Sequence, residues 1–274
     1  TLEQGLVGHW TFDGPKMVSN VADSSGQGNN GLLSGQTSTT TVAGRVGQAL
    51  SFDGVDDYVK VPSSSAFNFA ASGGFSYFMW FKKDTACSSA EGTTEVFTNR
   101  FGSDHGVKTW WFGCATGGGA PGKLAIDLIP GGAEVGGYVH SQSAINDGAW
   151  HYGGWVYDGS ANQARLYLDG VLQGASTTAF TVNFDVANPI CIGSYGTNCN
   201  GKLDDGGAYE ADAVFDDARV YNRALSASEI SRLYNLGATT RINTTIATNP
   251  NLTSSLIGHW TFDGPKMLSN VGDS

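Results

Sequence analysis

Residues 165–173 have the sequence Arg165-Leu-Tyr-Leu-Asp-Gly-Val-Leu-Gln173, in which an Asp-Gly pair separates two runs of alternating apolar and polar side chains. An Asp-Gly pair is typical of a two-residue turn in which both residues adopt positive φ, and that turn matches the twist of paired strands. The stretch therefore predicts a tight β-hairpin that turns at Asp169 and Gly170.

The same β pattern continues on both sides of this hairpin. Phe75–Lys82 is apolar at nearly every position, which predicts a central strand that is covered on both faces. Residues 49–62 predict a strand, an Asp-Gly turn and a second strand. Further strands are expected at 6–13, 123–129, 138–141, 151–157, 190–194 and 213–221. Residues 87–122 are predicted to form a long, irregular insertion.

One helix is predicted near the end of this series of strands. Ser226-Ala-Ser-Glu229 matches a capping box, and the apolar residues Ile230 and Leu233 follow at helical spacing. Gly237 is the expected C-terminal stop of the helix. Short strands, abundant glycine and a single helix indicate an all-β fold: a two-sheet antiparallel sandwich with one short C-terminal helix.

Charge and hydropathy exclude two classes of partner. The net charge is -10, and no cluster of Lys and Arg is present to neutralise phosphates, so neither nucleic acid nor an anionic membrane is expected as a partner. No apolar run approaches the 18 residues or more of a membrane span, so we expect no membrane insertion in this segment.

Four cysteines are present, and none of them forms a CxxC pair. We expect one disulfide between Cys191 and Cys199 and another between Cys87 and Cys114. Disulfides persist in oxidising compartments, so the cysteines favour an extracytoplasmic location. The alternative is four reduced cysteines in a cytosolic protein.

Residues 256–274 are a near copy of residues 6–24. Sixteen of nineteen positions are identical, and the three changes are small and apolar: Val7/Ile257, Val18/Leu268 and Ala22/Gly272. A period of this length corresponds to a whole domain rather than to a solenoid unit. We therefore predict a domain over residues 1–237, a Thr/Asn-rich linker over 238–255, and the first strand of the next repeat over 256–274.

Several short motifs, in this order, resemble those of the laminin-G-like, concanavalin A-like jelly rolls of bacterial surface proteins. They are His9-Trp-Thr-Phe-Asp13, Asp23-Ser-Ser-Gly-Gln-Gly-Asn-Asn-Gly31, Gly47-Gln-Ala-Leu-Ser-Phe-Asp-Gly-Val-Asp-Asp-Tyr58, Trp150-His151, Tyr157-Asp-Gly159, Leu166-Tyr-Leu-Asp-Gly170 and Asp216-Asp-Ala-Arg-Val-Tyr-Asn-Arg-Ala-Leu-Ser226. The resemblance covers residues 6–236 and implies a jelly-roll sandwich. The sequence departs from the family at the insertion 87–122 and at Tyr152-Gly-Gly154, where the family has bulkier apolar residues.

The loop from Asp23 to Gly31 is a candidate calcium site, because Gly/Asn turns expose backbone carbonyls beside carboxylate and amide oxygens. The resemblance implies a structural Ca²⁺ where this loop meets the last strand. The implied ligands are Asp23, Gly28, Asn30 and Asp217, with Asp13 and Asp216 as further candidates. The alternative is an Asx/Gly turn in which the carboxylate of Asp23 caps backbone amides.

Other acidic residues give weaker indications of chemistry. Asp53, Asp56 and Asp57 surround a tight turn, and adjacent strand carboxylates are expected to point to opposite faces and not to share one ion. Glu210 and Asp212 have the alternation that a glycan hydrolase requires of a carboxylate pair on one strand face. Glu91 and Glu95 are also four residues apart, but they are expected in the insertion loop and not on one strand. We therefore predict a protein without catalytic residues.

A sugar site requires an exposed aromatic ring beside polar groups, because the apolar face of a pyranose stacks on the ring. Trp110 and Trp111, with His105 nearby, are the candidate ligand-binding residues. Adjacent strand residues face opposite ways, so at most one of these tryptophans is expected to be exposed. The alternative is that the insertion packs over a small core of its own.

Three functions remain open from the sequence. The first is a non-catalytic extracellular repeat unit of a cell-surface protein, which adheres through glycan or cell-surface protein and carries a structural calcium. The second is a structural subunit of a stalk or filament, in which adjacent repeats are joined by terminal strand exchange. The third is a glycan hydrolase.

Overall fold

The computed structural model describes residues 1–14, 21–35, 40–67, 69, 73–83, 94–101, 105–113, 122–126, 139–176, 189–194, 199 and 210–239. For residues 94–101 and 105–113 it describes the backbone alone. Residues 1–240 form one compact unit. The predicted linker beyond residue 239 and the predicted repeat strand 256–274 lie outside the described residues.

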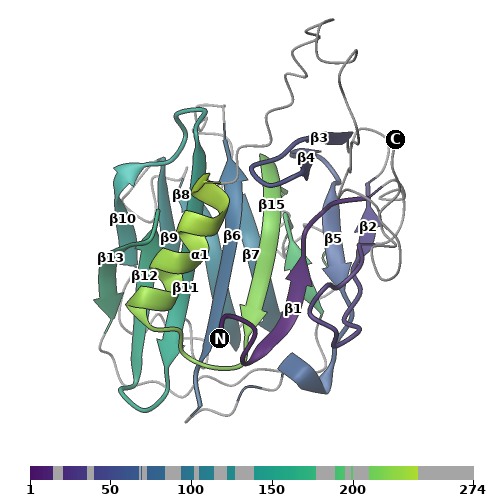
Figure 1. Cartoon of the computed structure of the whole chain (residues 1–274). Helices are drawn as coiled ribbons and strands as arrows, with labels where there is room; N and C mark the ends of the chain where they lie inside the picture. The colour runs from purple at the N-terminus through teal and green to yellow at the C-terminus, as the bar shows by residue number, and fades with distance from the viewer. Residues whose placement is uncertain are drawn as a thin grey trace, which may run out of the picture. The chain divides into compact units, whose positions relative to one another are not determined.

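The described strands form two antiparallel sheets (Figure 1). The eight-stranded sheet has the order β13 (Val171–Ser176), β12 (Gln163–Leu168), β11 (Trp150–Asp158), β6 (Phe75–Lys82), β15 (Asp212–Tyr221), β4 (Gln48–Asp53) and β3 (Thr40–Ala43), with β1 (Leu6–Trp10) paired to β15. The seven-stranded sheet has the order β10 (Val139–Ala144), β9 (Lys123–Ile126), β8 (His105–Gly113), β7 (Thr94–Phe101), β14 (Ile190–Ile192), β5 (Tyr58–Val61) and β2 (Leu32–Ser34). A short 3-10 helix spans Ser65–Phe67, and the α-helix α1 spans Ala227–Thr239. The predicted all-β sandwich with one C-terminal helix is confirmed.

β6 is the central strand that its sequence predicts, because both of its faces are buried. Alternate side chains point to opposite faces of a strand. Phe75, Tyr77, Met79 and Phe81 enter the main core between the sheets, whereas Phe78 and Trp80 enter a second core on the other face. Burying each large apolar side chain stabilises the fold by about 1.5–3 kcal/mol.

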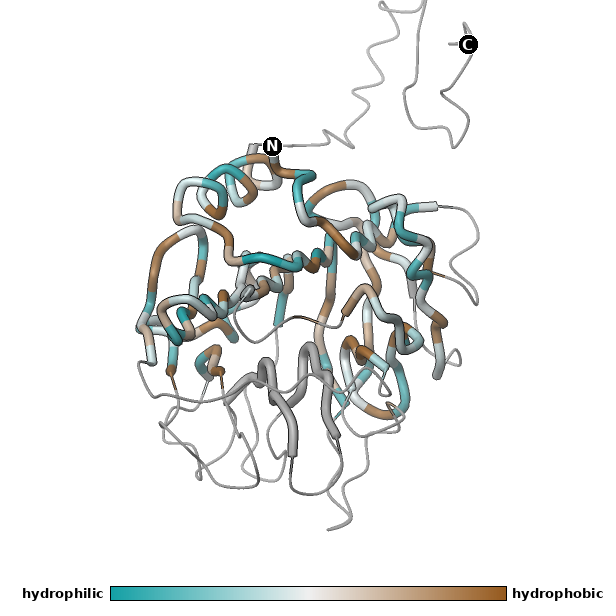
Figure 2. The backbone as a smooth tube through the Cα atoms, turned by 90° about the horizontal axis from the view of Figure 1, so that it is seen from below, coloured by the Kyte–Doolittle hydropathy of each residue, from teal (hydrophilic) through white to brown (hydrophobic). Residues whose placement is uncertain are grey.

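The second core lies under α1, on the outer face of the eight-stranded sheet. Ile230 and Leu233 of the helix pack with Tyr152 and Tyr221 of the sheet. Figure 2 looks along the strands and shows the helix as a separate layer outside this sheet. β6 is therefore apolar on both faces because the seven-stranded sheet covers one face and α1 covers the other.

The predicted capping box at the start of α1 is confirmed. The backbone N–H of Ser226 donates to Glu229 Oε2 at 2.9 Å, and the backbone N–H of Glu229 donates to Ser226 Oγ at 3.4 Å. The predicted stop at Gly237 is wrong, because α1 continues to Thr239. Gly237 instead allows close packing, since a Cβ there would lie 2.2 Å from Nε1 of Trp80.

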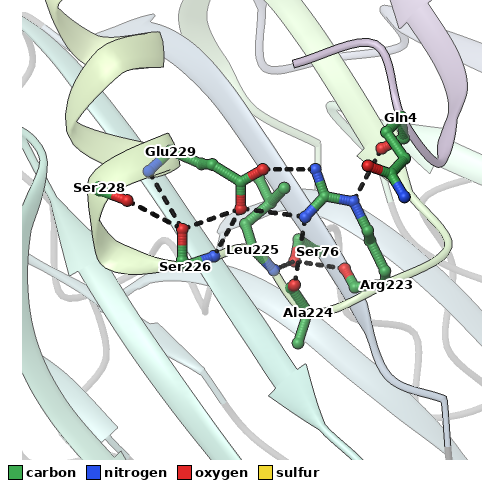
Figure 3. Close-up of polar contacts among 8 residues, drawn as sticks. All are labelled: Gln4, Ser76, Arg223, Ala224, Leu225, Ser226, Ser228 and Glu229. Carbon is green, nitrogen blue, oxygen red and sulfur yellow. Dashed lines mark hydrogen bonds and ion pairs between the residues drawn. The ribbon is translucent and has the colours of Figure 1, made fainter. Parts of the chain in front are cut away.

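Arg223 links three segments just before the helix (Figure 3). Its guanidinium binds both carboxylate oxygens of Glu229, at 3.0 and 2.7 Å, and its Nε donates to the carbonyl of Gln4 at 2.8 Å. The carbonyl of Arg223 accepts a hydrogen bond from Ser76 Oγ, which itself accepts the N–H of Leu225. The N-terminal segment, β6 and α1 are therefore joined at one corner.

The hairpin at residues 165–173 forms as predicted. Asp169 and Gly170 have φ values of 52° and 78°, and Leu168 pairs with Val171 across the turn. Residues 49–62 also form two strands, but β4 belongs to the eight-stranded sheet and β5 to the seven-stranded sheet. The turn at Asp53 and Gly54 therefore carries the chain from one sheet to the other rather than forming a hairpin.

Packing explains why residue 154, within the stretch Tyr152-Gly-Gly154 that departs from the resembled family, is a glycine. Gly154 of β11 is opposite Phe78 of β6, and a Cβ at Gly154 would lie 1.9 Å from the Phe78 ring. A bulkier residue at 154 therefore requires a smaller one at 78.

The prediction of an irregular insertion at 87–122 is wrong in its middle part. Residues 94–101 and 105–113 form β7 and β8, which pair with each other inside the seven-stranded sheet. The sequences of these two strands do not alternate regularly between apolar and polar residues, because polar residues and glycine interrupt the apolar ones.

The disulfide between Cys191 and Cys199 is confirmed, with Cα atoms 5.3 Å apart. It anchors residue 199 to β14, and both cysteines are fully buried. Cys87 and Cys114, the other expected pair, lie outside the described residues.

Candidate functional site

The candidate calcium loop, residues 21–31, lies along β1, and its hydrogen bonds centre on the carboxylate of Asp23. Oδ1 of Asp23 accepts the backbone N–H groups of His9 and Ser25 at 2.9 and 2.8 Å. Oδ2 accepts the hydroxyl of Ser25 and the N–H of Asn29 at 2.8 and 2.9 Å. Burial raises the pKa of Asp23, but these hydrogen bonds outweigh it and hold the pKa below its usual range.

The remaining residues of this loop complete the same turn. Oδ1 of Asn30 accepts the backbone N–H of Asp23 at 2.9 Å. Gly28 has a φ of 76° and lies where the chain reverses. The geometry of Asp23 is thus that of the Asx/Gly turn, the second of the two interpretations of this loop, because each carboxylate oxygen already accepts two hydrogen bonds.

Asp217 lies in a β-bulge of β15, where the register with β6 shifts between Asp216 and Arg219. Its φ of 50° is unusual for a residue other than glycine. Oδ1 of Asp217 is 2.6 Å from Nε2 of His9, and Oδ2 is 3.0 Å from Nη2 of Arg219. Burial raises the pKa of Asp217, but the His9 hydrogen bond and the Arg219 charge together hold it below the usual range.

Asp216 is the exception among these carboxylates. It is fully buried, and its Oδ2 accepts the N–H of Val46 at 2.8 Å. Its Oδ1 is buried without a hydrogen-bond partner. Burial, aided by the negative charge of Asp217, raises the pKa of Asp216 to about 8. A buried oxygen without a partner is costly and indicates a missing ligand or proton.

Val46 belongs to a short loop, residues 44–48. Asp13 contacts the other end of this loop. Oδ1 of Asp13 accepts the N–H of Gln48 at 2.7 Å. The loop is tightly turned, since the N–H of Gly44 donates to the carbonyl of Gly47 at 3.0 Å. Cβ atoms at the two glycines would lie 2.6 Å from Asp216 Oδ2 and 2.1 Å from Asp13 Oδ1. The glycines therefore allow both carboxylates to approach the loop backbone.

These contacts test which predicted ligands suit a calcium ion, which takes six to eight oxygens. Asp216 fits, because it offers a buried oxygen with no partner. Asp13 fits as a neighbouring carboxylate, and burial raises its pKa above the usual range. Asp23 and Asp217 fit poorly, because their oxygens are already paired with N–H donors, a hydroxyl, His9 and Arg219. Calcium binding itself stays a prediction.

A second acidic group forms the tight turn that the sequence predicts, but its carboxylates do not diverge as expected. Asp53, Asp56 and Asp57 each place a carboxylate oxygen within 4.8 Å of the others, although adjacent carboxylates were expected to diverge. The alternation rule does not apply, because β5 begins only at Tyr58 and Asp56 and Asp57 precede it. The N–H of Val55 donates to Asp53 Oδ1, and that of Asp53 donates to Asp57 Oδ2. These hydrogen bonds are those of a tight turn.

The candidate sugar-binding residues lie on β8. Trp110 pairs with Phe97 of β7, and Trp111 pairs with Glu95 of β7 and Ala125 of β9. His105 begins the same strand. All three residues therefore lie on an interior strand of the seven-stranded sheet, between β7 and β9.

The carboxylates considered for hydrolysis do not form a strand pair in the described residues. Asp212 is the first residue of β15 and pairs with Asp53, whereas Glu210 precedes the strand. Glu95 lies in β7, and Glu91 lies outside the described residues.

The surroundings of Asp216 were not predictable from the sequence. Its neighbour in the sequence, Asp217, contacts His9 and Arg219, and the β-bulge that gives the two residues different partners has no sequence signature. The only available signal was the pair of glycines at 44 and 47, which enclose the loop that Asp216 contacts.

Comparison with solved structures shows similar folds. The binding domain of Paraclostridial Mosquitocidal Protein 1 aligns with 86% of this chain, with 17% identity and a TM-score of 0.65. Domain 4 of AbnA, a GH43 extracellular arabinanase from Geobacillus stearothermophilus solved with arabinotriose, aligns with 84% of this chain and 98% of that domain, with 18% identity and a TM-score of 0.54. The binding domain of botulinum neurotoxin DC, solved with rat synaptotagmin II, aligns with 88% of this chain, with 13% identity and a TM-score of 0.61.

The chain spans about half the length of the two toxin domains, 53% in each case. No curated protein matches the chain significantly. In the part of the chain that the structure describes, no helix is long and apolar enough to cross a membrane. A laminin-G family model, described as the concanavalin A-like lectin/glucanases superfamily, matches residues 53–231. With the two-sheet sandwich and this match together, the chain belongs to the concanavalin A-like lectin/glucanases superfamily.

Proposed function

We propose that this chain is a non-catalytic, extracellular repeat unit of a surface protein, which adheres by binding a glycan or a cell-surface protein. The observation that carries the proposal is the family fold, shared with domains solved in complex with arabinotriose and with synaptotagmin II. The buried disulfide at Cys191 supports an oxidising, extracellular location. The repeat of residues 6–24 at 256–274 supports adjacent repeats of the same protein as further partners.

For a glycan, the proposed contacts are on β8. Aromatic rings stack on the apolar face of a sugar, and His105, Trp110 and Trp111 all lie on one strand. Because neighbouring strand residues point to opposite faces, one of the two tryptophans is expected to contact ligand and the other to pack.

A glycan array probed with the full chain tests this proposal. Substituting the contacting tryptophan by alanine is expected to weaken binding by at least tenfold, while the melting temperature stays near that of the wild type. Substituting the packed tryptophan is expected to lower the melting temperature instead. The matched control is Val171→Ala, because Val171 is 62% exposed on β13 in the other sheet.

The outcomes of this screen are distinct. The β8 site is supported if the chain retains one glycan class and one of the two tryptophan substitutions abolishes that binding. Binding to cells that protease treatment removes and glycosidase treatment spares indicates a protein partner. Release of reducing ends from a bound glycan would contradict a non-catalytic role and point to the hydrolase alternative.

We further propose that the chain holds a structural calcium beside β15. The supporting observation is the unpartnered, buried Oδ1 of Asp216, with Asp13 on the other side of the 44–48 loop. When bound, the ion would neutralise these carboxylates and cross-link β15 to the residues after β1. It would contribute stability rather than chemistry.

Melting with and without a chelator tests the calcium proposal, because a ligand that binds only the native state raises stability with the logarithm of its concentration once that concentration exceeds the Kd. At a calcium concentration of 100 times its Kd, the gain is about 2.7 kcal/mol. Asp216→Asn is expected to abolish the calcium-dependent rise in melting temperature, and Asp56→Asn is expected to leave it unchanged. The reverse pattern would move the ion to the turn at Asp53, and no calcium-dependent shift in the wild type would end the proposal.

A further inference from the structure

β1 occupies a position that is defined almost entirely by two other parts of the chain. On one side it pairs with β15, with Leu6 opposite Tyr221 and Trp10 opposite Ala218. On its other side it meets the loop 21–31, where the N–H of Ser24 donates to the carbonyl of His9 at 2.7 Å. We call this place between β15 and residues 21–31 the β1 position.

The β1 position selects its strand by particular side chains. Trp10 is fully buried, and its Nε1 donates to the carbonyl of Asn29 at 2.9 Å. Gly8 is required beside it, because a Cβ at Gly8 would lie 2.4 Å from the Trp10 ring. His9 makes the 2.6 Å contact with Asp217.

Asn29 makes a further contact to the backbone of the strand. Its Nδ2 donates to the carbonyl of Val7 at 2.7 Å, so the loop 21–31 binds β1 in the place of a neighbouring strand. All of these partners lie in residues 21–31 and 217–221, outside the segment 6–14 itself.

Residues 256–264 reproduce every feature that this position selects. They have the sequence Leu256-Ile-Gly-His-Trp-Thr-Phe-Asp-Gly264, and the one change from residues 6–14 is Ile257 in place of Val7. Val7 is 6% exposed, and both residues are β-branched, so the change adds one methyl group at a mostly buried site. The glycine, histidine and tryptophan are retained as Gly258, His259 and Trp260.

We infer that residues 256–264 are a second β1, able to bind at the β1 position of this domain when residues 6–10 do not occupy it. The inference is independent of the proposed ligand binding. Residues 240–255 reach at most about 58 Å when fully extended, which sets the distance over which the strand is delivered. Delivered to a second copy, it exchanges a strand between units and joins them head to tail.

Four full-length proteins test the inference: the wild type, Trp10→Ala, Trp260→Ala and the double variant. If residues 256–264 replace a weakened β1, Trp10→Ala melts within a few degrees of the wild type, and the double variant melts about 10 °C lower. Trp260→Ala alone is expected to melt like the wild type. Equal losses in Trp10→Ala and in the double variant would overturn the inference, because the second strand then gives no rescue.

A peptide of residues 254–266 provides the second measurement. Added in excess to the double variant, it is expected to raise the melting temperature, whereas the same peptide with Trp260→Ala is not. No rise with the unaltered peptide would overturn the inference. Should the tryptophan variants fail to fold, the same four-way comparison is made with His9→Ala and His259→Ala, where the expected losses are smaller.

Light scattering of Trp10→Ala identifies the source of the strand. Once the melting comparison has shown rescue, a monomer shows that the chain supplies its own second strand, and a dimer or larger species that grows with concentration shows exchange between copies.

Discussion

Glu229→Gln tests the corner at which α1 joins the sheet. The carboxylate of Glu229 accepts two hydrogen bonds from the Arg223 guanidinium and further ones from the N–H and hydroxyl of Ser226 (Figure 3). The Arg223 hydrogen bond is the largest cause of a pKa for Glu229 that falls from 4.5 to about 2. Glutamine keeps the shape of the side chain and removes its charge.

The magnitude follows from that pKa. A fall from 4.5 to about 2 is equivalent to about 3 kcal/mol of folding free energy when no part of the interaction is screened. The Arg223 and Glu229 side chains are 24% and 21% exposed, so solvent screening reduces the contribution to about 1–2 kcal/mol. Because the pKa is lower in the folded protein, this stability is present above pH 4.5 and is lost as the pH falls toward 2.

Urea unfolding, followed by tryptophan fluorescence between pH 7 and pH 2.5, measures the difference between the wild type and Glu229→Gln. The wild type is expected to be more stable by about 1–2 kcal/mol at pH 7, and the difference is expected to shrink toward zero near pH 2. Glu3→Gln is the matched control, because Glu3 is exposed. A difference that stays constant across this pH range would refute the argument, since the variant would then act through packing and not through charge.

Three further predictions concern the packing of the sandwich. Gly154→Val is expected to lower the free energy of unfolding in urea by at least about 3 kcal/mol, because its Cβ overlaps the Phe78 ring. Adding Phe78→Ala to the same chain is expected to recover part of that loss. Additive losses in the double variant would show that the two sites are independent. Gly237→Ala is expected to destabilise by about 1–2 kcal/mol in thermal unfolding, because the 2.2 Å approach to Trp80 outweighs the gain of up to about 1 kcal/mol in helix propensity, and stabilisation would contradict the packing role. Reducing the buried disulfide of β14 is expected to lower the free energy of unfolding by roughly 2–3 kcal/mol, and an unchanged urea midpoint in reductant would contradict this.

The fold was predictable where one local signal fixed one local structure. The turn at Asp169 and Gly170 needs only residues that tolerate positive φ, and the helix start at Ser226 needs only a capping pair. Gly237 shows the limit of such signals, because glycine suits both a helix end and a close approach. Which of these applies depends on Trp80, a residue far away in the sequence.

The candidate site was less predictable, for a related physical reason. Asp216 and Asp217 are adjacent in sequence, yet the bulge in β15 gives one an unpartnered, buried oxygen and the other two side-chain partners, His9 and Arg219. The strands β7 and β8 were missed because they have neither the continuous apolar run of β6 nor a regular alternation of apolar and polar residues. Pairing across a sheet supplies the information that the local pattern lacks.

The position of β15 in the sheet and in the sequence has a consequence for folding during synthesis. β15 joins β6 and its neighbours to β4 and β3, and among the described strands it is the one that pairs with β1. It is also the last of the described strands in the sequence, so in a chain emerging from the ribosome the other strands of the eight-stranded sheet stay in unjoined groups, with β1 unpaired, until residues 212–221 appear. Every unit of a tandem array would pass through that exposed stage once, and a ribosome that pauses before residue 212 would prolong it.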